Sequence, residues 1–222
     1  MRLIIFDVDG TLIDSQVLIT SAMTAAFEAM GWEAPRREET LSIVGLSLPV
    51  AMQRLRPSAT TAEIERMVEA YKAHFIVLRE EMGGEAAAPL YPGLREVLET
   101  LAQEDETFLG VATGKARRGL DHFFAAHDFA GMFATLQTAD LHPSKPHPAM
   151  IEAALTDVGV AASQAVMIGD TSFDMEMARA AGVRGIGVSW GYHPVARLKE
   201  AGADVIVDDA RALMDALKEP AL

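Results

Sequence analysis

Two aspartates stand two residues apart near the start of the chain, and their type and spacing could bind a cation. They follow the apolar run 3–6 and precede Gly10 and Thr11. Four apolar residues bounded by acidic residues and a glycine predict a buried strand that ends abruptly. Because strand side chains alternate between faces, Asp7 and Asp9 are expected to point the same way. Two neighbouring carboxylates repel unless positive charge lies between them, which predicts a cation at this position.

Three further polar clusters follow expected strands or lie in adjoining loops. Ligands of open parallel sheets bind beyond the carboxyl ends of the strands, so these clusters are expected to converge on the first two aspartates. The clusters are Thr113-Gly114-Lys115 after an apolar run at 107–112, Ser144-Lys145-Pro146 in a proline-rich loop, and Gly169-Asp170 with Asp174 after a run at 165–168.

Each cluster offers a different chemical group, and each also has a simpler interpretation. The Thr113 hydroxyl and the Gly114 backbone N–H could hold a phosphate near a helix start, or Thr113 could be a helix cap. Lys145 could neutralise the carboxylates and bind a phosphoryl oxygen, or it could be an ordinary solvated lysine. Asp170 and Asp174 are the oxygen donors that a hard cation prefers, or they could cap the next helix.

The elements that must position these residues alternate between strand and helix. Buried strands are expected at 3–6, 107–112, 133–136, 165–168, 185–188 and 205–207, with helical patterns between the later ones. This alternation predicts an α/β fold with a doubly wound parallel sheet and helices on both faces. Residues 1–14 and 89–222 are therefore predicted to form an α/β catalytic core.

Residues 15–88 contain only helical patterns and predict an inserted all-helical cap. Asp14 or Ser15 is a reasonable N-cap for the first of its helices. Thr60-x-x-Glu63 is a capping-box pattern that opens the longest one. The loop 45–47 is expected to face substrate, because its glycine allows close approach. No basic residue stands beside this loop, so recognition of a second anionic group is not evident.

Composition and charge exclude several classes of protein. The chain has 222 residues, no cysteine and a formal net charge of −13. The absence of cysteine excludes disulfides and thiolate metal sites. The acidic balance argues against nucleic acid and anionic membranes as partners. Since neither a signal peptide nor a membrane span is evident, we expect a cytoplasmic protein, either a monomer or a homodimer.

The four motifs, in order, resemble the signatures of the haloacid dehalogenase (HAD) superfamily over essentially the whole chain. The motifs are Asp7-x-Asp9-Gly-Thr, Thr113, Lys145 and Gly169-Asp170-x-x-x-Asp174. The helical insertion resembles the C1-type cap of that family. Residues 169–182 and 188–193 look like those of its phosphoglycolate phosphatase-like branch. The resemblance implies a Rossmann-like core of the HAD type and a hydrolase.

The resemblance also implies roles for the motif residues. Asp7 would attack phosphorus to give an aspartyl-phosphate, and Asp9 would protonate the leaving oxygen and then activate water. Thr113, the Gly114 N–H and Lys145 would hold the phosphoryl oxygens. The implied cofactor is Mg²⁺, bound by the Asp7 carboxylate, the Asp9 main-chain carbonyl and Asp170, with Asp174 as a further ligand or acting through water.

The resulting expectation is a Mg²⁺-dependent phosphatase that hydrolyses a small phosphorylated metabolite such as 2-phosphoglycolate. Dehalogenation is disfavoured because dehalogenases of the superfamily lack an aspartate at position 9. A pyrophosphatase, a sugar-phosphate phosphatase or a mutase of the same superfamily remains open. A phospho-accepting signalling module is a further alternative, although receiver domains are about half as long and lack the helical insertion.

Overall fold

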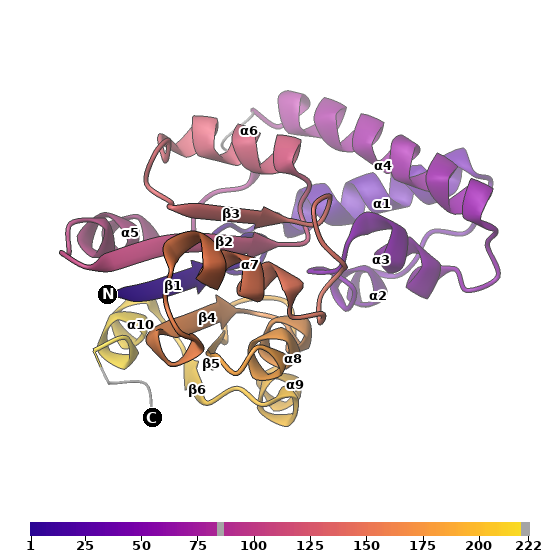
Figure 1. Ribbon diagram of the computed structural model, residues 1–222. Helices are drawn as coiled ribbons and strands as arrows, with labels where there is room; N and C mark the ends of the chain where they lie inside the picture. The colour runs from indigo at the N-terminus through magenta and orange to yellow at the C-terminus, as the bar shows by residue number, and fades with distance from the viewer. Residues whose placement is uncertain (84–86, 219–222) are drawn as a thin grey trace.

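The computed structural model describes residues 1–83 and 87–218, and its central element is a six-stranded parallel sheet. The strand order is β3-β2-β1-β4-β5-β6, so the order reverses at β1, the first strand in the chain (Figure 1). The predicted doubly wound α/β fold is confirmed. The strands are β1 Arg2–Phe6, β2 Thr107–Thr113, β3 Thr135–Thr138, β4 Ala165–Gly169, β5 Arg184–Val188 and β6 Val205–Val207.

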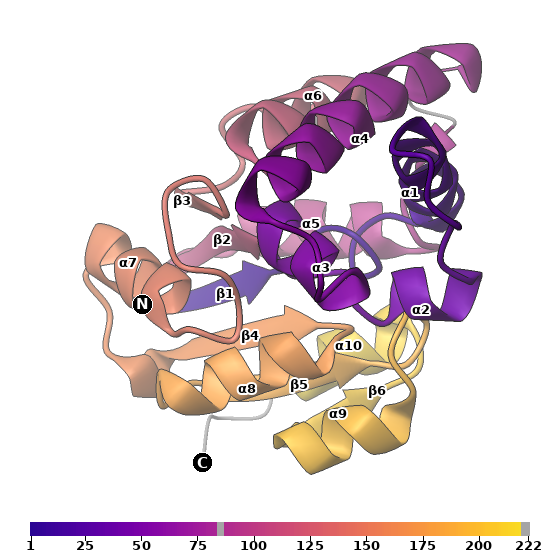
Figure 2. The same ribbon diagram turned by 90° about the vertical axis from the view of Figure 1, so that its right-hand side faces the viewer.

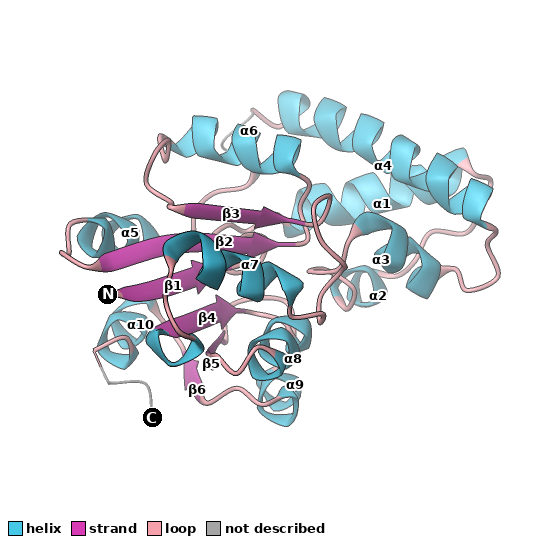
Figure 3. Ribbon diagram, viewed as in Figure 1, coloured by secondary structure: helices cyan, strands magenta, loops and turns pink. Residues whose placement is uncertain are grey.

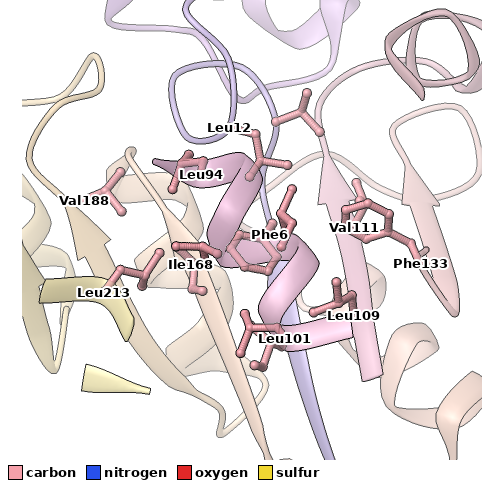
Figure 4. Packing of buried hydrophobic residues seen from close by; sticks show 14 of the residues in the cluster. Phe6, Leu12, Leu94, Leu101, Leu109, Val111, Phe133, Ile168, Val188 and Leu213 are labelled. Carbon is pink, nitrogen blue, oxygen red and sulfur yellow. The ribbon is translucent and has the colours of Figure 1, made fainter. Parts of the chain in front are cut away.

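Helices cover both faces of the sheet, as Figure 3 shows by colour. One face packs against α5 and α10, with α6 at its margin, and the aromatic ring of Phe6 lies at its centre (Figure 4). The other face packs against α7 and α8. Burial of these two apolar layers fixes the strand ends in space. The helices are α5 Leu94–Ala102, α6 Arg117–His127, α7 Ala149–Val158, α8 Ser172–Ala180, α9 Val195–Ala201 and α10 Ala210–Ala216.

The helices that follow β1 pack on one another beyond the carboxyl ends of the strands (Figures 1 and 2). They bury a second apolar cluster, which includes Met23, Met52 and Met67 and which Phe173 of α8 joins. As predicted, no strand occurs among the described residues between Ser15 and Ala88. The helices are α1 Gln16–Ala29, α2 Arg37–Leu41, α3 Leu48–Leu55 and α4 Thr61–Glu81.

The chain leaves the sheet region and returns to it at one point. The Asp14 backbone N–H donates to the Pro89 carbonyl at 2.9 Å, and Ile13 forms an antiparallel bridge with Leu90.

The Thr60–Glu63 capping box at the start of α4 is confirmed. No described helix is long and apolar enough to cross a membrane.

Several boundaries differ from those predicted. The strand expected at 133–136 is β3 at Thr135–Thr138, because Phe133 packs into the aromatic cluster beside α6 before the pairing with β2 begins. The helix α10 was not predicted, although Asp209 is a good N-cap signal: its carboxylate accepts from the Ala212 backbone N–H.

Candidate active site

Three buried carboxylates converge at the carboxyl ends of β1 and β4. Asp7 directly follows β1, Asp170 directly follows β4, and Asp174 lies in the first turn of α8. Each offers a carboxylate oxygen, and these three oxygens lie within 4.8 Å of one another. The reversal of strand order between β1 and its neighbours creates this crevice, which is where ligands of such sheets bind.

Lys145 completes this group, and we call Asp7, Lys145, Asp170 and Asp174 the inner cluster. Its side chain is fully buried, with Nζ 3.1 Å from Asp7 Oδ1 and 2.6 Å from Asp174 Oδ1. The carboxylates of Asp174 and Asp7 raise the pKa of Lys145 although burial acts in the opposite direction. The lysine therefore lies between two aspartates and is not the solvated lysine of the simpler interpretation.

Neighbouring groups fix the two carboxylates after β4. Asp174 Oδ2 accepts from the backbone N–H of Thr171 at 3.0 Å and from its hydroxyl at 2.7 Å. Asp170 accepts from the Thr11 hydroxyl at 2.9 Å and from the Tyr192 backbone N–H at 2.8 Å. A Cβ on Gly10 would lie 2.2 Å from Asp170 Oδ2, so glycine is required where the loop crosses this carboxylate.

Asp7 differs from the other members of the cluster. Its side chain is buried, and while Lys145 lies 3.1 Å from Oδ1, Oδ2 has no hydrogen-bond partner among the described residues. Burial raises the pKa of Asp7 to about 7, against the attraction of Lys145. Burial also raises the pKa of Asp170. Three carboxylates facing one lysine leave negative charge uncompensated, and an oxygen-binding divalent cation fits this donor set.

Asp9 lies outside the inner cluster and has its own partners. Its Oδ1 accepts from the Ser15 hydroxyl at 2.6 Å, and Lys115 Nζ lies 2.9 Å from its Oδ2. The Tyr192 hydroxyl accepts from the Ser15 backbone N–H at 2.9 Å. We call Asp9, Ser15 and Lys115 the outer group. Asp9 and Lys115 each retain 13% side-chain exposure, so this group reaches solvent while the inner cluster does not.

The loop at 45–47 packs directly on the two core loops that carry Gly114 and Lys145. A Cβ on Gly114 would lie 2.4 Å from the Gly45 carbonyl oxygen, so the two backbones approach as closely as glycine permits. The Ser47 backbone N–H donates to the Ser144 hydroxyl at 2.9 Å. Thr113 is buried at the end of β2, where its hydroxyl accepts from the Lys115 backbone N–H at 3.2 Å.

The structure brings Asp7, Asp170, Asp174 and Lys145 into contact range, with Thr113 and Gly114 at the same edge of the sheet. The prediction that strand alternation makes Asp7 and Asp9 point the same way is wrong, because β1 ends at Phe6 and Asp9 belongs to the following loop.

Four residues that contact the site aspartates were not predicted from the sequence: Ser15, Lys115, Thr171 and Tyr192. The side chain of Ser15 does not cap α1; instead it donates to Asp9, while Asp14 accepts from the Gln16 N–H. Thr171 could have been found, since Thr171-x-x-Asp174 has the spacing of a capping box.

The fold and the four motifs define a class of protein, and a comparison with known families identifies it. Residues 4–188 match the family model for haloacid dehalogenase-like hydrolases. The chain therefore belongs to this family, as the motif resemblance indicated.

Individual relatives indicate to which branch of this family the chain belongs. "Probable phosphatase IndB" of Dickeya dadantii is 36% identical over 208 residues, which cover 93% of this chain and 89% of the relative. A phosphoglycolate phosphatase of Agrobacterium fabrum is 32% identical over 230 aligned residues, covering 98% and 92% of the two chains. The crystal structure of a hydrolase from Pseudomonas syringae covers both chains completely, with a TM-score of 0.87 and 26% identity. The chain is thus an enzyme of the phosphoglycolate phosphatase-like branch, in the class of phosphoric monoester hydrolases.

Proposed function

We propose that the protein is a Mg²⁺-dependent phosphatase that hydrolyses a small phosphate monoester through an aspartyl-phosphate on Asp7. The observation that carries this proposal is the Asp7 carboxylate, which is buried beside Lys145 and whose Oδ2 has no hydrogen-bond partner among the described residues. Buried carboxylate oxygens are normally hydrogen-bonded, and one without a donor keeps its lone pairs available for a ligand or for bond formation.

In the proposed first step, an Asp7 oxygen attacks phosphorus as the bond from phosphorus to the ester oxygen breaks. Asp9 gives its proton to the departing oxygen, so the product leaves as an alcohol. In the second step, Asp9 takes a proton from water as that water attacks phosphorus and frees the Asp7 carboxylate. Ser15 supports both steps, because its hydroxyl holds the Asp9 carboxylate at the mouth of the site.

Thr113, the Gly114 N–H and Lys145 are proposed to hold the phosphoryl oxygens. Lys145 is fixed by Asp174 as well as by Asp7, so its ammonium group is already oriented before substrate enters. Preoriented donors of this kind account for much of the rate acceleration in charged transition states.

The proposed ligands of Mg²⁺ are the Asp7 carboxylate, the Asp9 main-chain carbonyl, Asp170 and Asp174. The fit rests on the spacing of the three carboxylate oxygens and on their uncompensated charge. When bound, the ion would neutralise this charge and attract the phosphoryl group. The residues themselves hold the geometry: the Thr171 and Thr11 hydroxyls orient Asp174 and Asp170.

We further propose that residues 15–88 act as a cap on a catalytic core of residues 1–14 and 89–222. The apolar cluster of α1–α4, to which the proposed core contributes Phe173, and the close backbone pairing of residues 13–14 with 89–90 support this division. 2-Phosphoglycolate is the first candidate substrate, supported by the phosphoglycolate phosphatases among the relatives. Pyrophosphatase and sugar-phosphate phosphatase or mutase activities are the alternatives within the superfamily. A cytoplasmic location and a monomeric or homodimeric state stay predictions.

The test is phosphate release from 2-phosphoglycolate, pyrophosphate and hexose phosphates, with Mg²⁺ and with a chelator, for wild type and Asp7→Asn. Metal-dependent turnover that the substitution abolishes supports the proposal, and the best substrate decides the branch. If no ester turns over but acetyl phosphate labels Asp7 stably, the protein is a phospho-accepting signalling module instead.

A further inference from the structure

We propose that the Tyr71 hydroxyl hydrogen-bonds an uncharged hydroxyl of the leaving group, so that phosphate esters of small polyols or sugars are the preferred substrates. Tyr71 lies on α4, outside the motifs that carry the chemistry. The inference rests on the proposed function, since it assumes that the ester oxygen departs beside Asp9. Among the candidate substrates of that function, it favours sugar-phosphate esters over 2-phosphoglycolate.

The Tyr71 hydroxyl is a buried polar group without a partner. Tyr71 exposes only 7% of its surface, and its hydroxyl forms no hydrogen bond with any described residue. The phenol oxygen is not fully enclosed, however, so part of the remaining exposure is its own. Buried polar groups are normally hydrogen-bonded, and a hydroxyl that is left open in this way is available to a ligand.

Aromatic and ionic contacts connect Tyr71 to the outer group. Its ring stacks on that of Phe75, one turn further along α4, with the ring centres 5.8 Å apart. Lys115 Nζ lies 5.4 Å from the centre of the Phe75 ring and 2.9 Å from Asp9 Oδ2. Because a cation is attracted to an aromatic face, this contact holds the Phe75 ring against the outer group. Tyr71 is therefore separated from the outer group by the thickness of one ring.

Electrostatics indicate that the hydroxyl lies close to the proposed acid. Burial raises the pKa of Tyr71, and the Asp9 carboxylate raises it further. A carboxylate has this effect on a phenol only when the two groups are near each other and little water screens them. The open hydroxyl and Asp9 therefore border the same space. In the proposed reaction, the leaving group occupies that space, because Asp9 must reach the ester oxygen.

The surroundings of the Tyr71 hydroxyl are apolar, so it can discriminate between leaving groups. Tyr71 belongs to the apolar cluster of α1–α4, together with Leu46, Met67 and Phe173. A leaving group that placed a methyl group here would bury the hydroxyl without a partner. Such an unpaired group weakens binding about 10- to 100-fold relative to a ligand that pairs with it.

An uncharged partner fits this position better than a second anion. A phenol hydroxyl donates and accepts one hydrogen bond each, which matches an alcohol hydroxyl. The Asp9 charge that disfavours a phenolate on Tyr71 also disfavours a carboxylate bound beside it. Lys115 and Lys145 already pair with aspartates of the site, so a second anion would compete with those carboxylates. This agrees with the expectation from sequence that recognition of a second anionic group is not evident.

The experiment compares kcat/KM for 2-hydroxyethyl phosphate with kcat/KM for propyl phosphate, in which a methyl group replaces the hydroxyl, with Mg²⁺ present. We expect wild type to prefer the hydroxylated ester and Tyr71→Phe to lower this preference about 10- to 100-fold. The variant should also gain activity on propyl phosphate, because no hydroxyl is then buried unpaired. Lys72→Met removes the neighbouring exposed lysine of α4 and should leave the preference unchanged.

Other outcomes overturn the inference. If Tyr71→Phe slows both esters equally, Tyr71 acts only through packing. If wild type has a higher kcat/KM for 2-phosphoglycolate than for 2-hydroxyethyl phosphate, the recognised group is an anion and not a hydroxyl. Both results leave the proposed phosphatase function standing. If wild type hydrolyses 4-nitrophenyl phosphate but neither alkyl ester, the inference fails alone, whereas a protein that hydrolyses no ester with Mg²⁺ contradicts the proposed function as well.

Discussion

The inner cluster and the outer group lie side by side but are held in different ways. Asp7, Lys145 and Asp174 are buried and touch one another directly. Asp9 is held instead by Ser15, at the point where the chain leaves for α1, and by Lys115, which contacts Phe75 of α4. The direct partners of the inner cluster thus come from the sheet and its loops, although Ser47 contacts Ser144 next to Lys145. The outer group is in addition in direct contact with α4, through Phe75.

This difference separates two tasks that the proposed reaction requires. Charge neutralisation and attack on phosphorus need a rigid arrangement that is the same for every ester. Proton transfer and recognition of the leaving group need groups that respond to the substrate. We therefore expect substitutions in the inner cluster to affect all substrates alike, and substitutions in the outer group to discriminate between them.

The largest effect is expected for Asp7→Asn. Removal of the nucleophile should lower kcat by about 10³-fold or more for every phosphate ester, because the amide cannot form the covalent intermediate. Steady-state phosphate release measures this loss, and trapping of radiolabelled protein after brief exposure to labelled substrate detects the intermediate in wild type only. A variant that retained a tenth of the wild-type rate would assign the attack to another group.

Lys145→Met tests whether the inner cluster is held by charge. Loss of one partner from a buried ionic cluster costs about 3–5 kcal/mol, because the remaining charges are left uncompensated. Urea unfolding in the presence of chelator should show this loss, and added Mg²⁺ should recover part of it by binding the folded state. The matched control is Lys218→Met, which removes an exposed ion pair with Asp215 and should not measurably change stability.

His193 tests the connection between the core and the helices α1–α4. It is buried, Nδ1 accepts from the Ser172 N–H at 3.0 Å, and Nε2 donates to the Ser42 carbonyl at 3.1 Å. Burial, and secondarily Arg197, lowers the pKa of His193 to about 4. Since the unfolded chain takes up this proton near pH 6.5, the contribution of His193 to stability is complete above pH 6.5 and is lost as the pH falls towards 4.

Between pH 7 and pH 4.5 this loss is expected to be about 2–3 kcal/mol. It is measured as the change with pH in the difference between the unfolding free energies of wild type and His193→Gln. Taking the difference removes the contribution of the carboxylates, which titrate in both proteins. A difference that stays constant between pH 7 and pH 4.5 would show that His193 does not titrate with folding.

The smallest effect is expected for Ser15→Ala. Loss of the hydroxyl that orients Asp9 should reduce kcat about tenfold for an alkyl phosphate, in line with the roughly 1.5 kcal/mol of a hydrogen bond to a charged group. The loss should be smaller for 4-nitrophenyl phosphate, whose leaving group needs little help from an acid. Ser163→Ala, at an exposed position, is the control. Equal losses for both esters would mean that Ser15 does not act through Asp9.

The sequence predicted the parts of the site that follow strands. The apolar runs before Asp7 and Asp170 are short and uninterrupted, so both the strands and the loops after them could be located. The rule that ligands bind at the carboxyl ends of parallel strands then brought Lys145 and Asp174 to the same place. These predictions needed only local patterns and one general rule of fold topology.

The outer group could not be predicted in the same way, because its contacts join distant parts of the chain. Ser15 has the local signature of a helix N-cap, and its contact with Tyr192 spans 177 residues. The direction of the Lys115 side chain depends on the absence of a Cβ at Gly119, which no charge or hydrophobic pattern reports. The end of β1 at Phe6 depends likewise on pairing with β2 and β4.

The contact between Gly114 and the Gly45 carbonyl joins main chain to main chain. Such a contact does not depend on side-chain identity, so residues of α1–α4 that do not contact the sheet region can be exchanged while this contact is kept. A chimaera that keeps the loop 45–47, Phe75 and the residues packed on Phe173 and Tyr192, and takes the rest of its helices from a relative, should therefore still seat over the same nucleophile. Evolution could then fit one hydrolytic centre to many metabolites by replacing a single modular segment.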